Sequence, residues 1–295
     1  MSIARTGELR QSGAVVPTWR PGDRALWYAL VAPAVAIMLA FYVYPLSRVL
    51  WMSVTEPVPG LGNYAELGDP TIVKVALTTV RICGVASAVT LVLSYIVAYC
   101  ITQSSVRTRG VMLICVLLPL WVSALVRSFA WIALLRREGL ANSALLELGV
   151  IDRPMTILWS ETAVLIGIVH YMLPYGILPL AASMGRIDRS LMVAARGLGA
   201  TPAQAFLRVF APLSLRGVAA SGIIVLTLSL GFYVTPALLG GGRTIMLTEY
   251  INVQVVDLVR WGTATMLATC LLATVLLLVA AVSILVHIPS YFADK

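Results

Sequence analysis

Charged residues are scarce in this sequence. Only 12% of its 295 residues are Asp, Glu, Lys or Arg, whereas 60% are hydrophobic, and the mean hydropathy is +0.93. Soluble globular domains are about a quarter charged, so this composition excludes a soluble fold. Six hydrophobic runs are each long enough for the ~20 residues that a membrane-spanning helix needs. We therefore predict an all-α integral membrane protein with six transmembrane helices, over residues 25–50, 75–101, 110–135, 163–183, 218–239 and 262–287.

Lysine is nearly absent, and this excludes ATP chemistry within the chain. The two lysines are Lys74 and Lys295, and neither follows the glycine-rich Gly-x-x-x-x-Gly-Lys loop that cradles nucleotide phosphates. If the chain takes part in ATP-driven work, a separate subunit must bind the nucleotide.

Cysteine and histidine are also few, which argues against a metal site or a disulfide framework. The four cysteines all fall in hydrophobic runs without metal-ligand spacing, at positions 83, 100, 115 and 270, so we expect small buried side chains. We expect His170 to pack within a span or line a pathway, and His287 to lie at the membrane interface. An intramembrane enzyme would need a nucleophile, base or metal cluster, and the spans contain no recognisable set.

The basic residues are distributed unevenly between the two sides of the membrane. Six spans put both termini on one side, which carries 12 Lys and Arg against 8 on the other. The positive-inside rule places that side in the cytoplasm, so the net charge of +8 reflects topology and not nucleic-acid binding. We predict a cytoplasmic tail over residues 1–24 that is not a signal peptide, a membrane domain over 25–288 and a short cytoplasmic tail over 289–295.

The most informative stretch is the loop of residues 186–217, which carries five arginines between two hydrophobic runs. Its pattern predicts two short helices that meet at a bend. Asp188 or Ser190 can cap the first helix, and Gly197 with Gly199 can end it, because glycine adopts positive φ without strain.

The second helix of this loop has a complete start signal. Thr201 is a good N-cap, Pro202 suits the first helical position, and Gln204 stands where a capping box places Glu or Gln. We expect Pro212 to end this helix.

The same loop resembles the EAA motif of the membrane subunits of bacterial ABC importers. That motif is Glu-Ala-Ala, three residues, Gly, nine residues, an aliphatic residue, one residue and Leu-Pro. Here Val193-Ala194-Ala195 is followed at those spacings by Gly199, Val209 and Ala211-Pro212. Val193 replaces the usual glutamate and Ala211 the usual leucine. An ordinary cytoplasmic helical hairpin is the alternative interpretation.

The resemblance implies a type I ABC importer permease in the bacterial inner membrane. Its loop would be the coupling helix that docks on an ATPase subunit, with coupling residues Val193, Ala194, Ala195, Arg196, Gly199, Thr201, Pro202, Val209 and Pro212. The implied partners are two copies of an ABC ATPase that bind ATP and Mg, a second homologous permease, an extracytoplasmic solute-binding protein and membrane lipid, with no nucleic acid. The chain itself would be non-catalytic and hold no cofactor or metal.

A second resemblance involves the third hydrophobic run. Leu118 to Trp131, with the later stretches 154–158 and 235–241, is similar to the spermidine and putrescine subgroup of importer permeases. Arg127 lies within this run, at a depth where a charge must be paired, face water or snorkel to the interface. It either lines the cavity or pairs with the partner permease, or it snorkels and packs the outer leaflet.

A polyamine would need carboxylates and aromatic faces in its pathway. None of the 13 acids falls in the core of a predicted span, so other small amino-group or opine-like solutes stay open. We expect helix breaks at Gly231–Pro236 and at Pro174 and Pro179, which can line a cavity or serve packing. The substrate-pathway candidates are Arg127, Trp131, Tyr171, Tyr175, Phe232 and Tyr233, each of which can also be a packing residue.

Two alternatives dispense with an ATPase. A secondary transporter usually carries intramembrane ionisable residues for ion coupling, and here only Arg127 qualifies. An intramembrane enzyme is the other alternative, and both predict activity of the chain alone.

Overall fold

The computed structural model describes residues 21–291, and the side chains of residues 28–284. Most of the predicted tails 1–24 and 289–295 lies outside the described residues, as does the side chain of His287. Between residues 21 and 291 the secondary structure is helical, without a strand. The chain divides into two compact units, residues 1–48 and residues 49–295.

The first unit contains helix α1 (Pro21–Met38), a π-helical turn (Leu39–Val43) and the beginning of α2 (Tyr44–Thr55). Pro33 lies inside α1, and Pro45 follows the π-helical turn. The Tyr44 N–H donates to the Leu39 carbonyl, five residues back. This wider turn accommodates a proline that would clash with a carbonyl in a regular α-helix.

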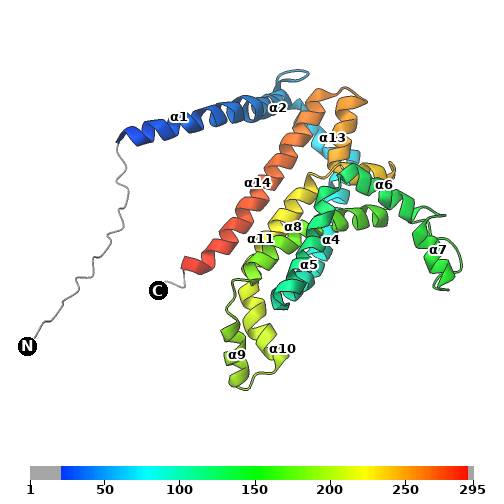
Figure 1. Cartoon of the computed structure of the whole chain (residues 1–295). Coiled ribbons are helices and arrows are strands. Elements are labelled where there is room, and N and C mark those ends of the chain that lie inside the picture. The colour runs from blue at the N-terminus through cyan, green and yellow to red at the C-terminus, as the bar shows by residue number, and fades with distance from the viewer. Residues whose placement is uncertain (1–20, 292–295) are drawn as a thin grey trace, which may run out of the picture. The chain divides into compact units, whose positions relative to one another are not determined.

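The second unit contains the other helices (Figure 1). Their bounds are α3 Gly62–Ala65, α4 Pro70–Gln103, α5 Val106–Leu117, α6 Ala124–Leu135, α7 Leu140–Glu147, α8 Glu161–Met184, α9 Arg189–Gly197, α10 Pro202–Ala205, α11 Ala211–Leu230, α12 Val234–Gly240, α13 Leu247–Val256 and α14 Trp261–Tyr291. Short 3₁₀ turns cover Glu66–Gly68 and Leu118–Trp121, and a π-helical turn covers Phe206–Phe210.

Within the described residues, five helices are long and apolar enough to span a membrane, or up to six if a bent pair counts as one span. The bent pair replaces the third predicted span. Its halves, 106–121 and 124–147, meet at 98°, so the prediction of one continuous helix over 110–135 is wrong. Val122 is extended, and the Ser123 side chain caps a new helix by accepting the Val126 N–H at 3.3 Å.

Two prolines that were expected to break the fourth span do not. Pro174 and Pro179 both lie inside the uninterrupted helix α8, and Pro174 is buried. Packing of α8 between α4 and α11 holds the helix together across the missing backbone bonds. The break predicted at 231–236 is confirmed, because α11 ends at Leu230 and α12 begins at Val234.

Helices α4, α8 and α11 lie side by side and form the centre of this unit. Small residues allow their close approach: a Cβ on Gly176 of α8 would lie 2.4 Å from Ser94 Oγ of α4. At Gly217 of α11 a Cβ would lie 2.5 Å from Ser183 Oγ of α8. Such contacts are how helices associate where lipid removes the hydrophobic driving force. In Figure 1, α9 and α10 lie at one end of this bundle and α13 at the other.

The cysteines do not share one environment. Cys83 is buried and Cys270 half-buried, but Cys100 and Cys115 are exposed, so the prediction of four buried cysteines is wrong for these two. Their helices turn apolar faces outward, and in a membrane protein an outward face contacts lipid. Hydrophobicity alone therefore does not tell an inward face from an outward one.

Candidate functional site

The first half of loop 186–217 folds as its local signals predict. Asp188 Oδ1 accepts the Ser190 N–H at 2.9 Å and begins α9, so Asp188, and not Ser190, is the cap. This hydrogen bond holds the pKa of Asp188 below its usual range. The helix ends with the Ala200 N–H on the Ala195 carbonyl (3.1 Å) and the Gly199 N–H on the Arg196 carbonyl (3.0 Å). Gly199 adopts φ +90°, which glycine tolerates.

The second half contains the predicted capping box. The Gln204 N–H donates to Thr201 Oγ1 (3.3 Å), and the Thr201 N–H donates to Gln204 Oε1 (2.9 Å). The expected helix end at Pro212 is wrong, because the chain continues through it into α11. The preceding π-helical turn, in which the Ala211 N–H donates to the Phe206 carbonyl, makes room for the proline ring.

Aromatic side chains fasten this second half to the end of α4. Phe206 and Phe210 meet the Tyr99 ring edge-on, with centroids 5.3 and 5.1 Å apart. One turn earlier on α4, the Tyr95 hydroxyl lies 2.9 Å from Ser214 Oγ of α11. A displacement of the loop would therefore be transmitted to α4 and α11.

The loop exposes large apolar side chains, and one of them, Leu198, lies at its tip. Leu198, Val193 and Leu207 are 91%, 70% and 65% exposed. Val193 was predicted as a coupling residue, whereas Leu198 and Leu207 were missed. The signal for Leu198 was its position between Gly197 and Gly199, where the chain reverses and no neighbour can cover it. Apolar clusters of this kind mark interaction sites.

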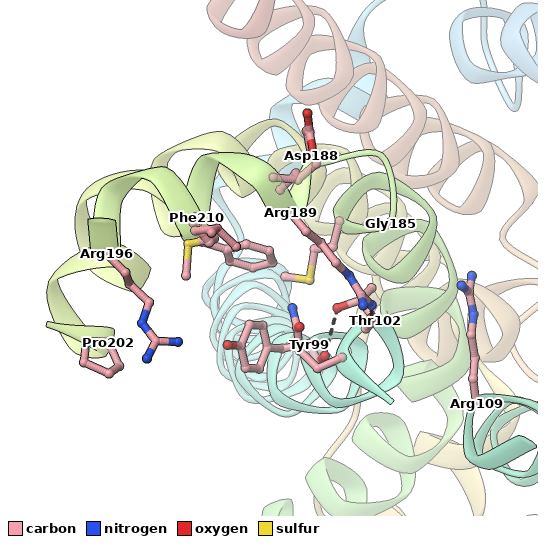
Figure 2. A pocket seen from close by; sticks show the side chains of 14 residues that line it. Tyr99, Thr102, Arg109, Gly185, Asp188, Arg189, Arg196, Pro202 and Phe210 are labelled. Carbon is pink, nitrogen blue, oxygen red and sulfur yellow. Dashed lines mark hydrogen bonds between the residues drawn. The ribbon is translucent and has the colours of Figure 1, made fainter. Parts of the chain in front are cut away.

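A cavity of about 370 Å³ separates α9 from the ends of α4 and α5 (Figure 2). The predicted coupling residues Val193, Arg196 and Pro202 line it together. Arg109 and Arg189 also line it, although sequence analysis did not select them. Arg189 Nη2 donates to the carbonyl of Thr102, a buried residue at the end of α4.

The other predicted coupling residues do not line this cavity. Ala195 and Val209 are half-buried, and Ala194 and Pro212 are exposed on the loop surface. If Ala194 and Ala195 act in coupling, they do so without contacting this cavity.

Arg127 lies in the broken third span and is only 7% exposed. Its Nη2 donates to the carbonyls of Pro119 and Val122, the latter at 3.0 Å. Its guanidinium carbon lies 4.7 Å from the centre of the Tyr171 ring. These contacts rule out a snorkelling side chain. They satisfy the carbonyls where the helix breaks, while Nε and Nη1 have no hydrogen-bond partner among the described residues.

Four of the six pathway candidates come together. Arg127 stacks on Tyr171, which also contacts Phe232 (centroids 4.4 Å apart) and Tyr175 (6.0 Å). Trp131 instead donates its Nε1–H to His170 Nδ1 at 3.1 Å, with the two rings edge-on. Tyr233 is 39% exposed at the start of α12.

One acidic residue near the other end of the bundle was also missed. Glu249 in α13 is half-buried, and its Oε2 has no hydrogen-bond partner within residues 28–284. Burial raises the pKa of Glu249, and a hydrogen bond from the Met246 backbone partly offsets this. Among the described residues, no group of three His, Cys, Asp or Glu side chains could hold a metal ion.

These features define a class of protein: a helical membrane permease with a structured, exposed loop at one end of its bundle. Residues 90–290 match the family described as binding-protein-dependent transport system inner membrane component. The chain belongs to this family, and it is a permease subunit of a binding-protein-dependent ABC importer in a bacterial inner membrane. The chain itself is a non-catalytic transmembrane component.

Its relatives agree with this assignment. It is 33% identical over 221 residues to the spermidine/putrescine transport system permease protein PotB of Escherichia coli (strain K12), covering 74% of this chain and 80% of PotB. PotB of Haemophilus influenzae is 30% identical, covering 81% and 80%. The fold is similar to a chain in the crystal structure of a bacterial alginate ABC transporter in complex with an alginate pentasaccharide-bound periplasmic protein. That likeness has a TM-score of 0.77 at 19% identity, covering 88% of this chain and 93% of that chain.

Proposed function

We propose that this chain forms half of the translocation pathway of an ATP-driven importer and couples to an ATPase through loop 186–217. The second half would come from a homologous permease, and an extracytoplasmic binding protein would deliver the solute. Two ATPase copies would bind ATP and Mg. The observation that carries this proposal is the loop itself, a capped helical turn with an exposed apolar tip that is fastened to α4 and α11.

The same proposal places the loop and both termini in the cytoplasm. The support is the excess of basic residues on that side, including the loop's five arginines. The tails 1–24 and 289–295 would then be cytoplasmic segments around the membrane domain 25–288.

Coupling would use the mechanical connection described above. When ATP binding brings the two ATPase subunits together, the docked tip around Leu198 and Gly199 would move with its ATPase. Phe206 and Phe210 would pass this movement to Tyr99 of α4. ATP binding would favour the outward-facing conformation of the helices, and hydrolysis would reset them to inward-facing, because a ligand shifts an equilibrium only if it binds the two conformations with different affinities.

We propose a polyamine, or a related small solute with amino groups, as the substrate. Support comes from the PotB relatives and from Tyr175 and Phe232, whose rings can contact a cation. Arg127 covers the Tyr171 ring and would repel a cation, and no acid was found in the core of a span. The carboxylates that such a substrate requires would therefore come from the partner permease.

The experiment is to purify the tagged chain gently from its native membrane and identify the proteins that accompany it. ATP hydrolysis is then measured with the accompanying binding protein, either empty or loaded with putrescine or spermidine. We expect a P-loop ATPase, a second permease and several-fold stimulation by the polyamine-loaded binding protein. Stimulation by another solute would refute the substrate assignment, and transport by the chain alone would refute the coupling proposal.

A further inference from the structure

The cavity beneath α9 has a lining that the coupling function does not explain. Three of its side chains are arginines: Arg109 from α5, and Arg189 and Arg196 from α9. In the view of Figure 2, Arg189 lies between the other two. Asp188 adds one acid, but its carboxylate is occupied by the Ser190 N–H. The cavity therefore has an excess of positive charge that is suited to an anion.

The place of the cavity in the fold points to the membrane surface. Its wall includes Thr102 and Gln103, the last residues of α4, and Met184, the last residue of α8. Both helices are long and apolar enough to be membrane spans. Side chains at the ends of two spans lie at the level of lipid headgroups, and not deep in the aqueous phase.

The wall is also partly apolar, through Met184, Met192, Tyr99 and Phe210. A free inorganic anion gains nothing from such surfaces, whereas a phospholipid brings a phosphate and an adjoining glycerol and acyl region. Basic pockets between membrane helices on the cytoplasmic side suit anionic headgroups. The volume of about 370 Å³ is enough for one headgroup.

We propose that this cavity binds the phosphate headgroup of an anionic phospholipid from the cytoplasmic leaflet. Arg109, Arg189 and Arg196 supply the positive charge around the phosphate, and Arg189 also remains on the Thr102 carbonyl. The lipid then connects α5, in the membrane domain, to the coupling helix α9. The cytoplasmic placement of this site rests on the proposed function.

The test compares lipid retention by two charge-matched double variants of the complex. Arg109→Gln with Arg196→Gln removes two arginines of the cavity. Arg107→Gln with Arg208→Gln removes two exposed arginines, from α5 and the same loop, that do not line it. Each complex is placed in nanodiscs of phosphatidylcholine with a titrated fraction of phosphatidylglycerol, and bound phosphatidylglycerol is counted by native mass spectrometry after extraction.

We expect the cavity variant to bind phosphatidylglycerol about thirty-fold more weakly, since each of the two arginines lost from the cavity contributes about fivefold to binding of the phosphate. The control variant should bind like the wild type. Inorganic phosphate at millimolar concentration should not displace the lipid. Equal lipid binding by the two variants would overturn the proposal, as would displacement by phosphate, which would indicate a free anion as the ligand.

A third outcome concerns protein instead of lipid. If the cavity variant loses the ATPase during purification but keeps its phosphatidylglycerol, the arginines bind an acidic segment of the partner, and the lipid proposal is wrong. Failure of the proposed importer function can be distinguished from failure of the lipid proposal. If no ATPase accompanies the wild-type chain, lipid retention can still be measured on the chain itself.

Discussion

Two arginines in this protein perform the same task in opposite surroundings. Arg189 donates to the Thr102 carbonyl at the end of α4, and Arg127 donates to the Pro119 and Val122 carbonyls at the break in the third span. Arg189 is exposed beside the cavity at the end of the bundle, whereas Arg127 is buried within a membrane span and covered by Tyr171. Helix ends need partners for their carbonyls everywhere, but at a break within a membrane span no water is present as a substitute.

We infer from this difference that loop 186–217 can move, whereas the region around Arg127 is held in one conformation. The loop end gains little stability from any one contact, so it can be displaced by a partner. Around Arg127, the carbonyls and aromatic rings depend on one charged side chain. Five substitutions, two of them with matched controls, test this contrast, from the largest expected effect to the smallest.

Gly199→Pro should break the loop end without unfolding the membrane domain. Proline requires φ near −65°, whereas Gly199 is at +90°, and proline also lacks the N–H that binds the Arg196 carbonyl. We expect normal membrane insertion but at least about a tenfold loss of substrate-stimulated ATP hydrolysis, because a coupling element displaced by ~1 Å can cost up to ~100-fold.

Gly197→Ala is the matched control for this substitution. Gly197 lies in α9 without positive φ, and a Cβ there meets nothing within 4 Å. The complex that contains Gly197→Ala should show the same substrate-stimulated ATP hydrolysis as the wild type. Retained stimulation in Gly199→Pro would remove the loop from the coupling mechanism.

Arg127→Met and Arg189→Met compare the two arginines directly. Loss of Arg127 leaves the Pro119 and Val122 carbonyls without this donor inside a membrane span, at a cost of about 1–3 kcal/mol each. Loss of Arg189 leaves the Thr102 carbonyl beside the cavity, where water can replace the guanidinium, and should change stability by no more than about 0.5 kcal/mol. The shift in the thermal midpoint of each purified variant in detergent measures these two changes in stability. Equal shifts would show that burial does not distinguish these sites.

Thr201→Ala should weaken the loop more mildly. It removes the side chain that accepts the Gln204 N–H, a loss of about 0.5–2 kcal/mol for an N-cap. We expect faster amide hydrogen exchange over residues 202–206 and a several-fold lower stimulation of ATP hydrolysis. Thr201→Ser keeps the acceptor and should restore both, and if it does not, the cap is not the cause.

Glu249→Gln is expected to have the smallest effect, at the opposite end of the bundle. Burial raises the pKa of Glu249 above 4.5, so the folded protein binds more protons than the unfolded chain between 4.5 and the raised value. The contribution of Glu249 to the free energy of unfolding is therefore most favourable below pH 4.5, and it is lost as the pH rises through the pKa of the folded state. Glutamine should raise the thermal midpoint at pH 7.5 by about 1–2 °C. An equal rise at pH 4 would contradict this assignment.

The sequence predicted best what depends on neighbouring residues. The Asp188 cap, the positive φ of Gly199 and the capping box at Thr201 are local signals, and the structure has all three. The helix break at 231–236 was also predicted, because a glycine and a proline stand at the two ends of this stretch.

Prolines were predicted poorly, for an identifiable reason. Pro212 continues a helix through a π-helical turn, and Pro174 is held by packing against neighbouring helices. Conversely, the third span bends at Val122 and Ser123, close to Pro119, where a continuous helix was expected. Whether a proline interrupts a helix depends on wider turns and tertiary contacts that a sequence pattern does not contain.

The contacts of Arg127 were likewise not predictable. Its depth indicated a constrained charge, but its partner Tyr171 lies on α8, far along the chain, and its carbonyl acceptors exist only because the span is broken. Sequence also could not reveal the cavity at α9, since Arg109 and Arg189 meet there only after α4, α5 and α8 are packed.

The central claim, that loop 186–217 contacts an ATPase, is tested most directly by photo-crosslinking in the intact complex. The photoreactive residue p-benzoylphenylalanine replaces either Leu198, 91% exposed at the loop tip, or Leu258, 53% exposed after α13 at the other end of the bundle. We predict that position 198 crosslinks to the ATPase subunit and that position 258 does not. Crosslinking of the ATPase from position 258, with none from position 198, would contradict the proposed coupling and the orientation of the chain in the membrane.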